Sequence, residues 1–376
     1  MTARIPLSSP DITEAEIDAV TRVLRTPALS LGPELEAFEA ALTAYHSVPH
    51  AVAVSSGTAG LHLALLTLGI GEGDEVIVPS FAFVAVANVV LQVRARPVFA
   101  EIDPVTLNLD PTSVERAVTP RTRAILIVHT FGVPAEMNAL REIAGRYRLA
   151  LIEDACEAIG AEYRGRRVGS FGDLAVLGFY PNKQLTTGEG GAVLARDPAH
   201  AARLRSLRNQ GRRGSDWLDH AEPGYNYRLS EMACALGRVQ LSRIGEMLAL
   251  RQAAAERYDA LLRGAPGPIH GLELPPLTLP RRTISWFVYV VRLPEQVDRD
   301  RVQATLAGRD IATGRYFAPI HLQPAWRGHP SAGAAVLPLT ESISRRTLAL
   351  PFFNRIVFSQ QEEVAAALHG AVCPSD

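Results

Sequence analysis

Short apolar runs alternate with segments of helical pattern between residues 51 and 153. The runs are AVAV (51–54), EVIVP (75–79), PVFAEI (97–102), RAILIV (123–128) and LALIE (149–153). Segments of helical pattern lie near residues 57–68, 82–93, 112–117 and 136–147. Strands that are apolar on both faces and alternate with helices are typical of a parallel sheet covered by helices. The pattern therefore predicts an α/β fold for this part of the chain.

The flanking sequence adds two helices before this region and two strands after it. Thr13 and Glu16 have the spacing of a capping box, which predicts a helix that ends near Arg25, and a second helix is expected from about Pro33. The apolar runs LAVLGF (174–179) and AVLAR (192–196) have the length of strands. The stretch between these two runs is rich in glycine and contains the sequence NKQLTTGEGG.

The C-terminal third predicts a second, smaller domain. A long helical stretch covers residues 230–262, and the Gly- and Pro-rich segment 264–280 is typical of a linker. After it come a strand at 286–293, a helix near 298–307 and a C-terminal helix that begins near residue 359. We predict an N-terminal segment and large domain over residues 1–262, and a small α+β domain over residues 263–376.

The composition is that of an ordinary soluble protein, with 47% hydrophobic and 20% charged residues and a net charge of −1. The near-neutral charge gives no indication of a nucleic-acid partner. The uncharged run 76–93 contains Pro79 and three polar residues, and it predicts a strand, a loop and a buried helix in place of a membrane span. We therefore expect neither nucleic acid nor membrane as a partner.

The three cysteines, Cys156, Cys234 and Cys373, are far apart and have neither CxxC nor metal-site spacing. They fit a reducing compartment, and Cys156 is interpreted as a small core residue. The N-terminus lacks the apolar segment of a signal peptide. We expect a cytoplasmic protein without a metal.

Lys183 is the only lysine, although the chain has 38 Lys and Arg residues in total. A lysine amine can lose its proton in a desolvated site and form a Schiff base with a carbonyl, whereas arginine stays protonated. Lys183 is followed by Gly188, Gly190 and Gly191, which allow the backbone to approach a ligand closely. These features favour covalent chemistry at Lys183 over a leftover surface lysine.

A catalytic Schiff base needs an electron sink, and pyridoxal phosphate is a common one. Asp154 ends a predicted strand, where a carboxylate can pair with the cofactor's ring nitrogen or can cap the next helix. The segment SSGTAG (55–60) follows a strand and opens a helix, so it is a candidate phosphate site or a plain N-cap. Phe83 is a candidate for stacking on the ring, although a lone Phe beside Val is more often a core residue.

Five motifs together resemble the DegT/DnrJ/EryC1/StrS family of pyridoxal-phosphate-dependent sugar aminotransferases. They are SSGTAGL (55–61), VPSFAFVA (78–85), EDACEA (153–158), NKQLTTGEGG (182–191) and GYNYRLSE (224–231). The resemblance extends from about residue 5 to residue 370. It implies fold type I of the pyridoxal-phosphate enzymes, the fold of aspartate aminotransferase. This fold has a large domain with a mixed, mostly parallel sheet and a smaller C-terminal α+β domain.

The resemblance also implies roles for individual residues. Lys183 would form the Schiff base and move the proton, and Asp154 would pair with the pyridinium nitrogen. The phosphate would lie on Gly57 and Thr58, and Phe83 would stack on the ring. In the family, the residue at the position of Asn226 reaches the phosphate in the neighbouring subunit, which implies a homodimer with shared sites.

Two positions depart from the family pattern. Gly178 stands where members often have a serine that contacts the phosphate. Glu157 stands where members often have Gln or His bonded to the cofactor's phenolic oxygen. Because two facing anions repel each other, we expect Glu157 either to be protonated or to point away.

The resemblance implies transfer of an amino group from a donor, expected to be L-glutamate, through pyridoxamine phosphate to a nucleotide-linked 4-keto or 3-keto sugar. The TTGEGG form resembles members that aminate C4 more than those that aminate C3. Candidate substrate contacts are Arg228, Arg315, Tyr316 and His321. A cyclitol ketone is an alternative substrate, and a non-catalytic cofactor-binding regulator is an alternative of another class.

Overall fold

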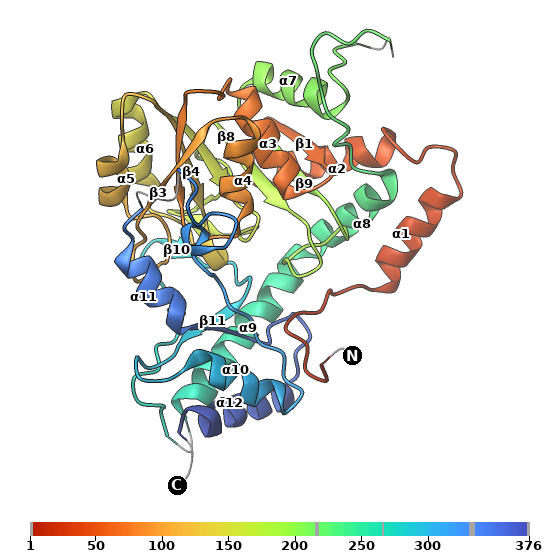
Figure 1. The fold of residues 1–376 in the computed structure, drawn as a ribbon. Helices are drawn as coiled ribbons and strands as arrows, with labels where there is room; N and C mark the ends of the chain where they lie inside the picture. Colours follow the sequence, from red (N-terminus) through yellow and green to blue (C-terminus); the bar gives the residue numbers. More distant parts are fainter. Residues whose placement is uncertain (1–2, 215–217, 265–266, 331–334, 374–376) are drawn as a thin grey trace.

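The computed structural model describes residues 3–214, 218–264, 267–330 and 335–373. Within these ranges the chain forms a large helix-covered sheet and a smaller group of elements around a two-stranded sheet (Figure 1). In Figure 1 the long helix α9, Ile244–Arg263, runs from the large sheet towards the smaller group.

The large sheet has seven strands in the order β1-β9-β8-β5-β4-β2-β3. Their bounds are β1 His50–Val54, β2 Glu75–Pro79, β3 Arg96–Ala100, β4 Thr122–Val128, β5 Ala150–Asp154, β8 Leu174–Gly178 and β9 Gly191–Ala195. Strand β9 is antiparallel to both of its neighbours, and the other adjacent pairs are parallel. The mixed, mostly parallel sheet that we predicted is therefore confirmed.

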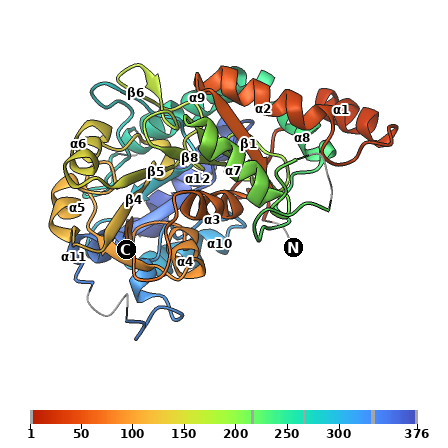
Figure 2. The same ribbon diagram turned by 90° about the horizontal axis from the view of Figure 1, so that it is seen from above.

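Helices cover both faces of this sheet, as Figure 2 shows from above. One face carries α3 Gly57–Thr67, α4 Ala85–Gln92 and α7 Pro198–Arg208. The opposite face carries two groups of helices. One group is α2 Pro33–His46 and α8 Glu231–Ser242, and the second group is α5 Pro111–Ala117 and α6 Met137–Tyr147. Helix α1, Glu14–Leu24, packs on α8 and has the expected capping box at Thr13.

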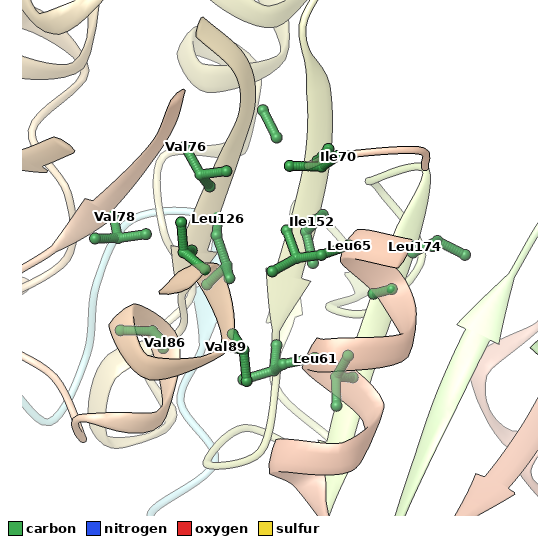
Figure 3. Close-up of a cluster of buried hydrophobic side chains, with 14 of the residues drawn as sticks. Leu61, Leu65, Ile70, Val76, Val78, Val86, Val89, Leu126, Ile152 and Leu174 are labelled. Carbon is green, nitrogen blue, oxygen red and sulfur yellow. The ribbon is translucent and has the colours of Figure 1, made fainter. Parts of the chain in front are cut away.

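The core between α3, α4 and the sheet accounts for the apolar residues on one face of the strands, and the clusters on the opposite face account for the others. Leu61 and Leu65 of α3 and Val86 and Val89 of α4 meet side chains of the sheet such as Leu126, as Figure 3 shows. All of them are at most 1% exposed. Burial of these aliphatic side chains, at about 1.5–3 kcal/mol each, anchors the first turn of α3 over the carboxyl ends of β5 and β8.

The smaller group contains β11 Tyr289–Arg292 paired antiparallel with β12 Thr347–Leu350. Around this pair lie α10 Arg299–Ala307, α11 Pro338–Arg346 and α12 Phe358–Val372. Its hydrophobic core also contains Ile5 from the N-terminal segment and Tyr258 from α9. Residues on both sides of position 262 thus share one core, and the domain boundary at 262 stays a prediction.

Short elements connect these units. They are β6 Glu162–Tyr163, β7 Arg166–Arg167 and β10 Arg282–Thr283, which form a three-stranded sheet, and the 3₁₀ turns η1 Thr130–Gly132 and η2 Ile320–Leu322. The long helical stretch that we predicted over 230–262 is two helices, α8 and α9, which meet at Arg243. In the described part of the chain, no helix has both the length and the apolar character that crossing a membrane requires.

Candidate active site

A cavity of about 510 Å³ lies where several strands end and α3 begins. Asp154 is the last residue of β5, Gly178 is the last residue of β8, and Gly57 is the first residue of α3, and all three line it. The carboxyl ends of parallel strands and the N-terminus of a helix meet at this point, which is where open α/β sheets bind ligands.

Lys183 reaches the cavity from the loop between β8 and β9. Its backbone N–H donates to the carbonyl of Tyr180 at 2.9 Å. The amine Nζ lies 3.9 Å from the centre of the Phe287 ring and 3.4 Å from Oε1 of Glu157. Only 15% of the side chain is exposed. Lys183 is therefore a largely buried amine held between a ring and a carboxyl group.

Two threonines fix the loop that carries this lysine. The backbone N–H of Thr187 and the hydroxyl of Thr186 both donate to the carbonyl of Phe179, each at 3.0 Å. A β-carbon at Gly190 would lie 2.2 Å from Oγ1 of Thr187, and Gly188 has a φ of +80°. The glycines that suggested close approach to a ligand are thus needed by the turn itself.

Asp154 presents a buried carboxylate to the same cavity. Its Oδ1 accepts the backbone N–H of Cys156 at 3.0 Å, and the residue is 8% exposed. Among the described residues, none forms an ion pair with Asp154. A buried carboxylate without a cationic partner is costly, so the site fits a ligand that supplies a positive charge or an N–H donor there.

The first turn of α3 provides backbone donors at the wall of the cavity. Oγ of Ser56 caps the helix by accepting the N–H of Ala59 at 3.0 Å. Ser56, Gly57 and Thr58 all line the cavity. A helix of eleven residues with its N-terminus at a cavity is suited to bind an anion such as a phosphate.

Aromatic side chains make up much of the cavity wall: Phe83, Phe179, Tyr180, Phe287, Tyr316 and Phe317. Phe83 lines it with 62% of its surface exposed, and Phe287 and Tyr316 line it from the smaller group of elements. The rings of Phe287 and Tyr316 are nearly parallel, with centroids 6.2 Å apart. Such ring surfaces are suited to contact a flat, apolar ligand.

Glu157 points into the cavity, towards the lysine. Besides Nζ of Lys183 at 3.4 Å, it meets the backbone N–H of Phe131, which donates to Oε2 at 3.0 Å. Burial raises the pKa of the Glu157 carboxyl group, and the nearby Asp154 adds to this rise, while Lys183 opposes it. Of our two expectations for Glu157, a side chain that points away does not fit this geometry, and the raised pKa means that the carboxyl group takes up a proton more readily than an ordinary glutamate does.

Seven of the predicted site residues line this single cavity: Gly57, Thr58, Phe83, Asp154, Glu157, Lys183 and Tyr316. Four others do not. Asn226 is exposed, and Arg228 donates to Oδ1 of Asn209 at 2.9 Å. Arg315 forms an ion pair with Asp300 at 3.2 Å, and Nδ1 of the buried His321 lies 2.6 Å from Oγ of Ser80.

Sequence reasoning missed several lining residues. Tyr180, Asn182 and Glu189 flank the lysine, and their proximity in sequence was a usable signal. Phe287 lies within a long apolar run, and no feature of the sequence marked it as a site residue. Cys156, interpreted as a core residue, packs against the core and also lines the cavity. Within the described ranges, no three His, Cys, Asp or Glu side chains gather as a metal site would require.

Known aminotransferases are similar to this protein over nearly the whole chain. The model of the DegT/DnrJ/EryC1/StrS aminotransferase family matches residues 10–369. A protein of Streptomyces venezuelae named dTDP-3-amino-3,4,6-trideoxy-alpha-D-glucose transaminase is 46% identical over 341 residues, which is 90% of this chain and 87% of the relative. The erythromycin biosynthesis sensory transduction protein EryC1 of Saccharopolyspora erythraea is 42% identical and covers 94% of each chain.

Solved structures also match this chain over nearly its whole length. DesV of S. venezuelae in complex with a ketimine intermediate has a TM-score of 0.90 and 42% identity, and covers 100% of both chains. The PLP form of Spr1654 from Streptococcus pneumoniae has a TM-score of 0.91 and 27% identity, and covers 98% of both. The predicted fold, that of the PLP-dependent aminotransferases, is therefore confirmed, and this chain belongs to the DegT/DnrJ/EryC1/StrS aminotransferase family.

Proposed function

We propose that this aminotransferase binds pyridoxal 5'-phosphate in the cavity and attaches it covalently to Lys183. The observation that carries the proposal is that the only lysine of the chain and the buried carboxylate of Asp154 line the same cavity. The amine would hold the cofactor's aldehyde, and the carboxylate would pair with its ring nitrogen. The first turn of α3, at Gly57 and Thr58, would hold the phosphate.

When bound, pyridoxal phosphate supplies an electron sink that stabilises a carbanion next to the amino group. The residues of the chain do the rest. Asp154 would keep a proton on the ring nitrogen by charge pairing, and Phe83 would contact the ring. The Lys183 amine, freed when an amino donor takes its place, would move the proton from the donor's carbon to the cofactor, and in the second half of the reaction it would move a proton from the cofactor to the acceptor's carbon.

We further propose that the donor is L-glutamate and that the acceptor is a dTDP-linked 3-keto deoxysugar. The 46% identity to a protein named dTDP-3-amino-3,4,6-trideoxy-alpha-D-glucose transaminase supports this class. That name favours C3 over the C4 amination that the TTGEGG form suggested. Of the four candidate substrate contacts, Tyr316 lines the cavity of its own chain and the other three do not.

A homodimer with shared sites also belongs to this proposal. Asn226 is exposed and lies outside the cavity of its own chain, so it would act on the cavity of a second copy, and Arg228 lies two residues further along the same segment. Among the described residues of one chain, Lys183 is the only cation that lines the cavity. The three cysteines are free in the structure, which suits the cytoplasmic location that we propose.

The test is a complete turnover with defined substrates. The full chain is loaded with pyridoxal phosphate and incubated with L-glutamate and a dTDP-linked 3-keto deoxysugar, and the amino sugar and 2-oxoglutarate are measured by mass spectrometry. A 4-keto isomer, a UDP-linked sugar and a cyclitol ketone are tested in parallel. Preferential amination of the dTDP-linked 3-keto sugar is expected, and preferential turnover of any other acceptor would contradict the proposed substrate.

A regulatory role is the second candidate, because one relative is named a sensory transduction protein. The same assay separates the two functions. A regulator can bind the cofactor without releasing 2-oxoglutarate, whereas an aminotransferase releases one 2-oxoglutarate for each amino sugar formed.

A further inference from the structure

Glu157 is the carboxyl group that directly faces the lysine. Its Oε1 lies 3.4 Å from Nζ of Lys183, and the two side chains are 8% and 15% exposed. Its Oε2 is held by the backbone N–H of Phe131 at 3.0 Å. The carboxyl group is thus fixed at one oxygen and directed with the other towards the amine.

The groups around Glu157 come from several elements. Lys183 approaches from the loop after β8, Asp154 and Cys156 from the end of β5 and the turn after it, and Tyr316 from the segment before η2. Lys183 is the only cation among these groups. Because burial raises the pKa of Glu157, this carboxyl group can hold a proton more readily than an ordinary glutamate can.

A glutamine in this position would donate and accept hydrogen bonds, but it could not take a proton from an ammonium group. A glutamate can both accept that proton and return it. The residue type therefore matters for the step in which Lys183 changes from an ammonium group to a nucleophile.

We propose that Glu157 is a second catalytic acid–base residue, which takes a proton from Lys183 as the amine attacks the cofactor's aldehyde and delivers it to the departing oxygen. This inference rests on the proposed function, because it requires pyridoxal phosphate as the aldehyde.

The step balances without another reactant. The Lys183 ammonium gives one proton to Oε1 of Glu157, and the neutral Nζ forms a bond to the aldehyde carbon. The carbonyl oxygen then leaves as water, with one proton from Nζ and one from Glu157. Nζ keeps one hydrogen, a double bond to carbon and a positive charge, and Glu157 is again a carboxylate that faces this charge.

The test measures how fast the C=N bond forms. Full-length chain freed of cofactor is mixed with pyridoxal phosphate, the absorption band of the C=N bond is followed with time, and quenching with borohydride gives the fraction of modified Lys183 by mass spectrometry. The variants are Glu157→Gln and Glu157→Ala, each with and without added acetate. Glu142→Gln and Glu142→Ala are the matched controls, because Glu142 is exposed on α6 and pairs with Arg146.

We expect both Glu157 variants to form the bond about 100-fold more slowly than the natural chain. Acetate should accelerate Glu157→Ala in proportion to its concentration, because it can occupy the space of the lost carboxyl group. It should not accelerate the natural chain or the Glu142 variants. A merely structural role for Glu157 would not produce this dependence on acetate.

Equal rates in the natural chain and in Glu157→Ala, or slowing that acetate does not relieve, would overturn the inference. If Glu157→Ala does not give the natural circular dichroism spectrum, Glu157→Asp serves instead. Aspartate keeps the carboxyl group but has a side chain that is one carbon shorter. Glu157→Asp should therefore form the C=N bond faster than Glu157→Gln does, and equal rates in these two variants would overturn the inference. A natural chain that forms no C=N bond would instead overturn the proposed function.

Discussion

Cys156 fills the space that a side chain at Gly178 would need. A β-carbon built on Gly178 would lie 3.0 Å from both Cβ and Sγ of Cys156, and one on Gly57 would lie 2.8 Å from the same Sγ. The thiol therefore sits between the end of β8 and the start of α3. This packing explains why glycine stands at 178, where members of the family often have a serine that contacts the phosphate.

The first prediction tests this packing. Gly178→Ser should lower the free energy of unfolding by about 1–3 kcal/mol, because the new side chain collides with Cys156. Gly178→Ser combined with Cys156→Ala should recover at least about 1 kcal/mol of that loss. Urea unfolding of the single and double variants measures both values.

Gly145→Ser is the matched control, because a β-carbon at Gly145 would meet no atom within 4 Å. It should leave the free energy of unfolding within about 0.5 kcal/mol of the natural value. Additive effects of the substitutions at 178 and 156 would show that the two side chains do not compete for the same space.

The second prediction concerns Asp154. Asp154→Asn keeps the size of the side chain but removes the charge that would pair with the cofactor's ring nitrogen. We expect the rate of the half-reaction with L-glutamate to fall by about 100-fold or more, since the electron sink is weakened. Covalent attachment of pyridoxal phosphate to Lys183, measured by borohydride reduction and mass spectrometry, should be retained. An unchanged rate of this half-reaction would show that Asp154 does not have the proposed role.

The sequence predicted the framework of the site because that framework follows from local patterns. Strand ends at Asp154 and Gly178 and the helix start at Gly57 follow from apolar runs and turn residues, and Lys183 is conspicuous as the only lysine. Phe287 comes from a distant part of the chain and lies within an apolar run, so only tertiary packing shows that its ring contacts Nζ. The pairing of β12 with β11 was missed for a similar reason, since a four-residue apolar run carries no periodic signal.

The third prediction concerns the residue next to Asp154 on β5. The carboxylate of Glu153 is buried and accepts the backbone N–H groups of Gly169, Phe171 and Gly172 at 2.8, 2.7 and 2.7 Å. Its Oε2 also lies 3.0 Å from Nε2 of His129. Glu153→Gln would place an amide N–H₂ against some of these donors, so we expect a loss of about 3 kcal/mol in the free energy of unfolding.

Urea unfolding at neutral pH checks this value, with Glu142→Gln as the exposed control that should change little. If Glu153→Gln unfolds at the same urea concentration as the natural chain, the hydrogen bonds from these backbone donors to a charged Glu153 do not contribute to the free energy of unfolding.

The fourth prediction is a pH dependence that arises from His46. Burial lowers the pKa of His46 to about 4, and Nδ1 donates to the carbonyl of Val168 at 3.2 Å. The folded-state pKa lies below the unfolded value of about 6.5, so the unfolded chain binds the proton first as the pH falls. The stability associated with neutral His46 is therefore present at pH 7 and is lost progressively between about pH 6.5 and pH 4.

Between pH 7 and pH 5 this effect should amount to about 2 kcal/mol. The natural chain and His46→Gln are unfolded with urea at both pH values, and the difference between the two proteins should shrink by that amount at pH 5. A difference that is the same at both pH values would mean that His46 titrates alike in the folded and unfolded chains.

Attachment of the cofactor to Lys183 and transfer of an amino group can be followed in a single experiment. The natural chain is loaded with pyridoxal phosphate, one half is reduced with borohydride and mapped by peptide mass spectrometry, and the other half receives L-glutamate while its absorption spectrum is recorded. We expect modification of Lys183, together with loss of the cofactor's C=N absorption band and release of 2-oxoglutarate. If the chain takes up no pyridoxal phosphate, or carries it on a group other than Lys183, then Lys183 is not the residue that holds the cofactor and the proposed function is wrong.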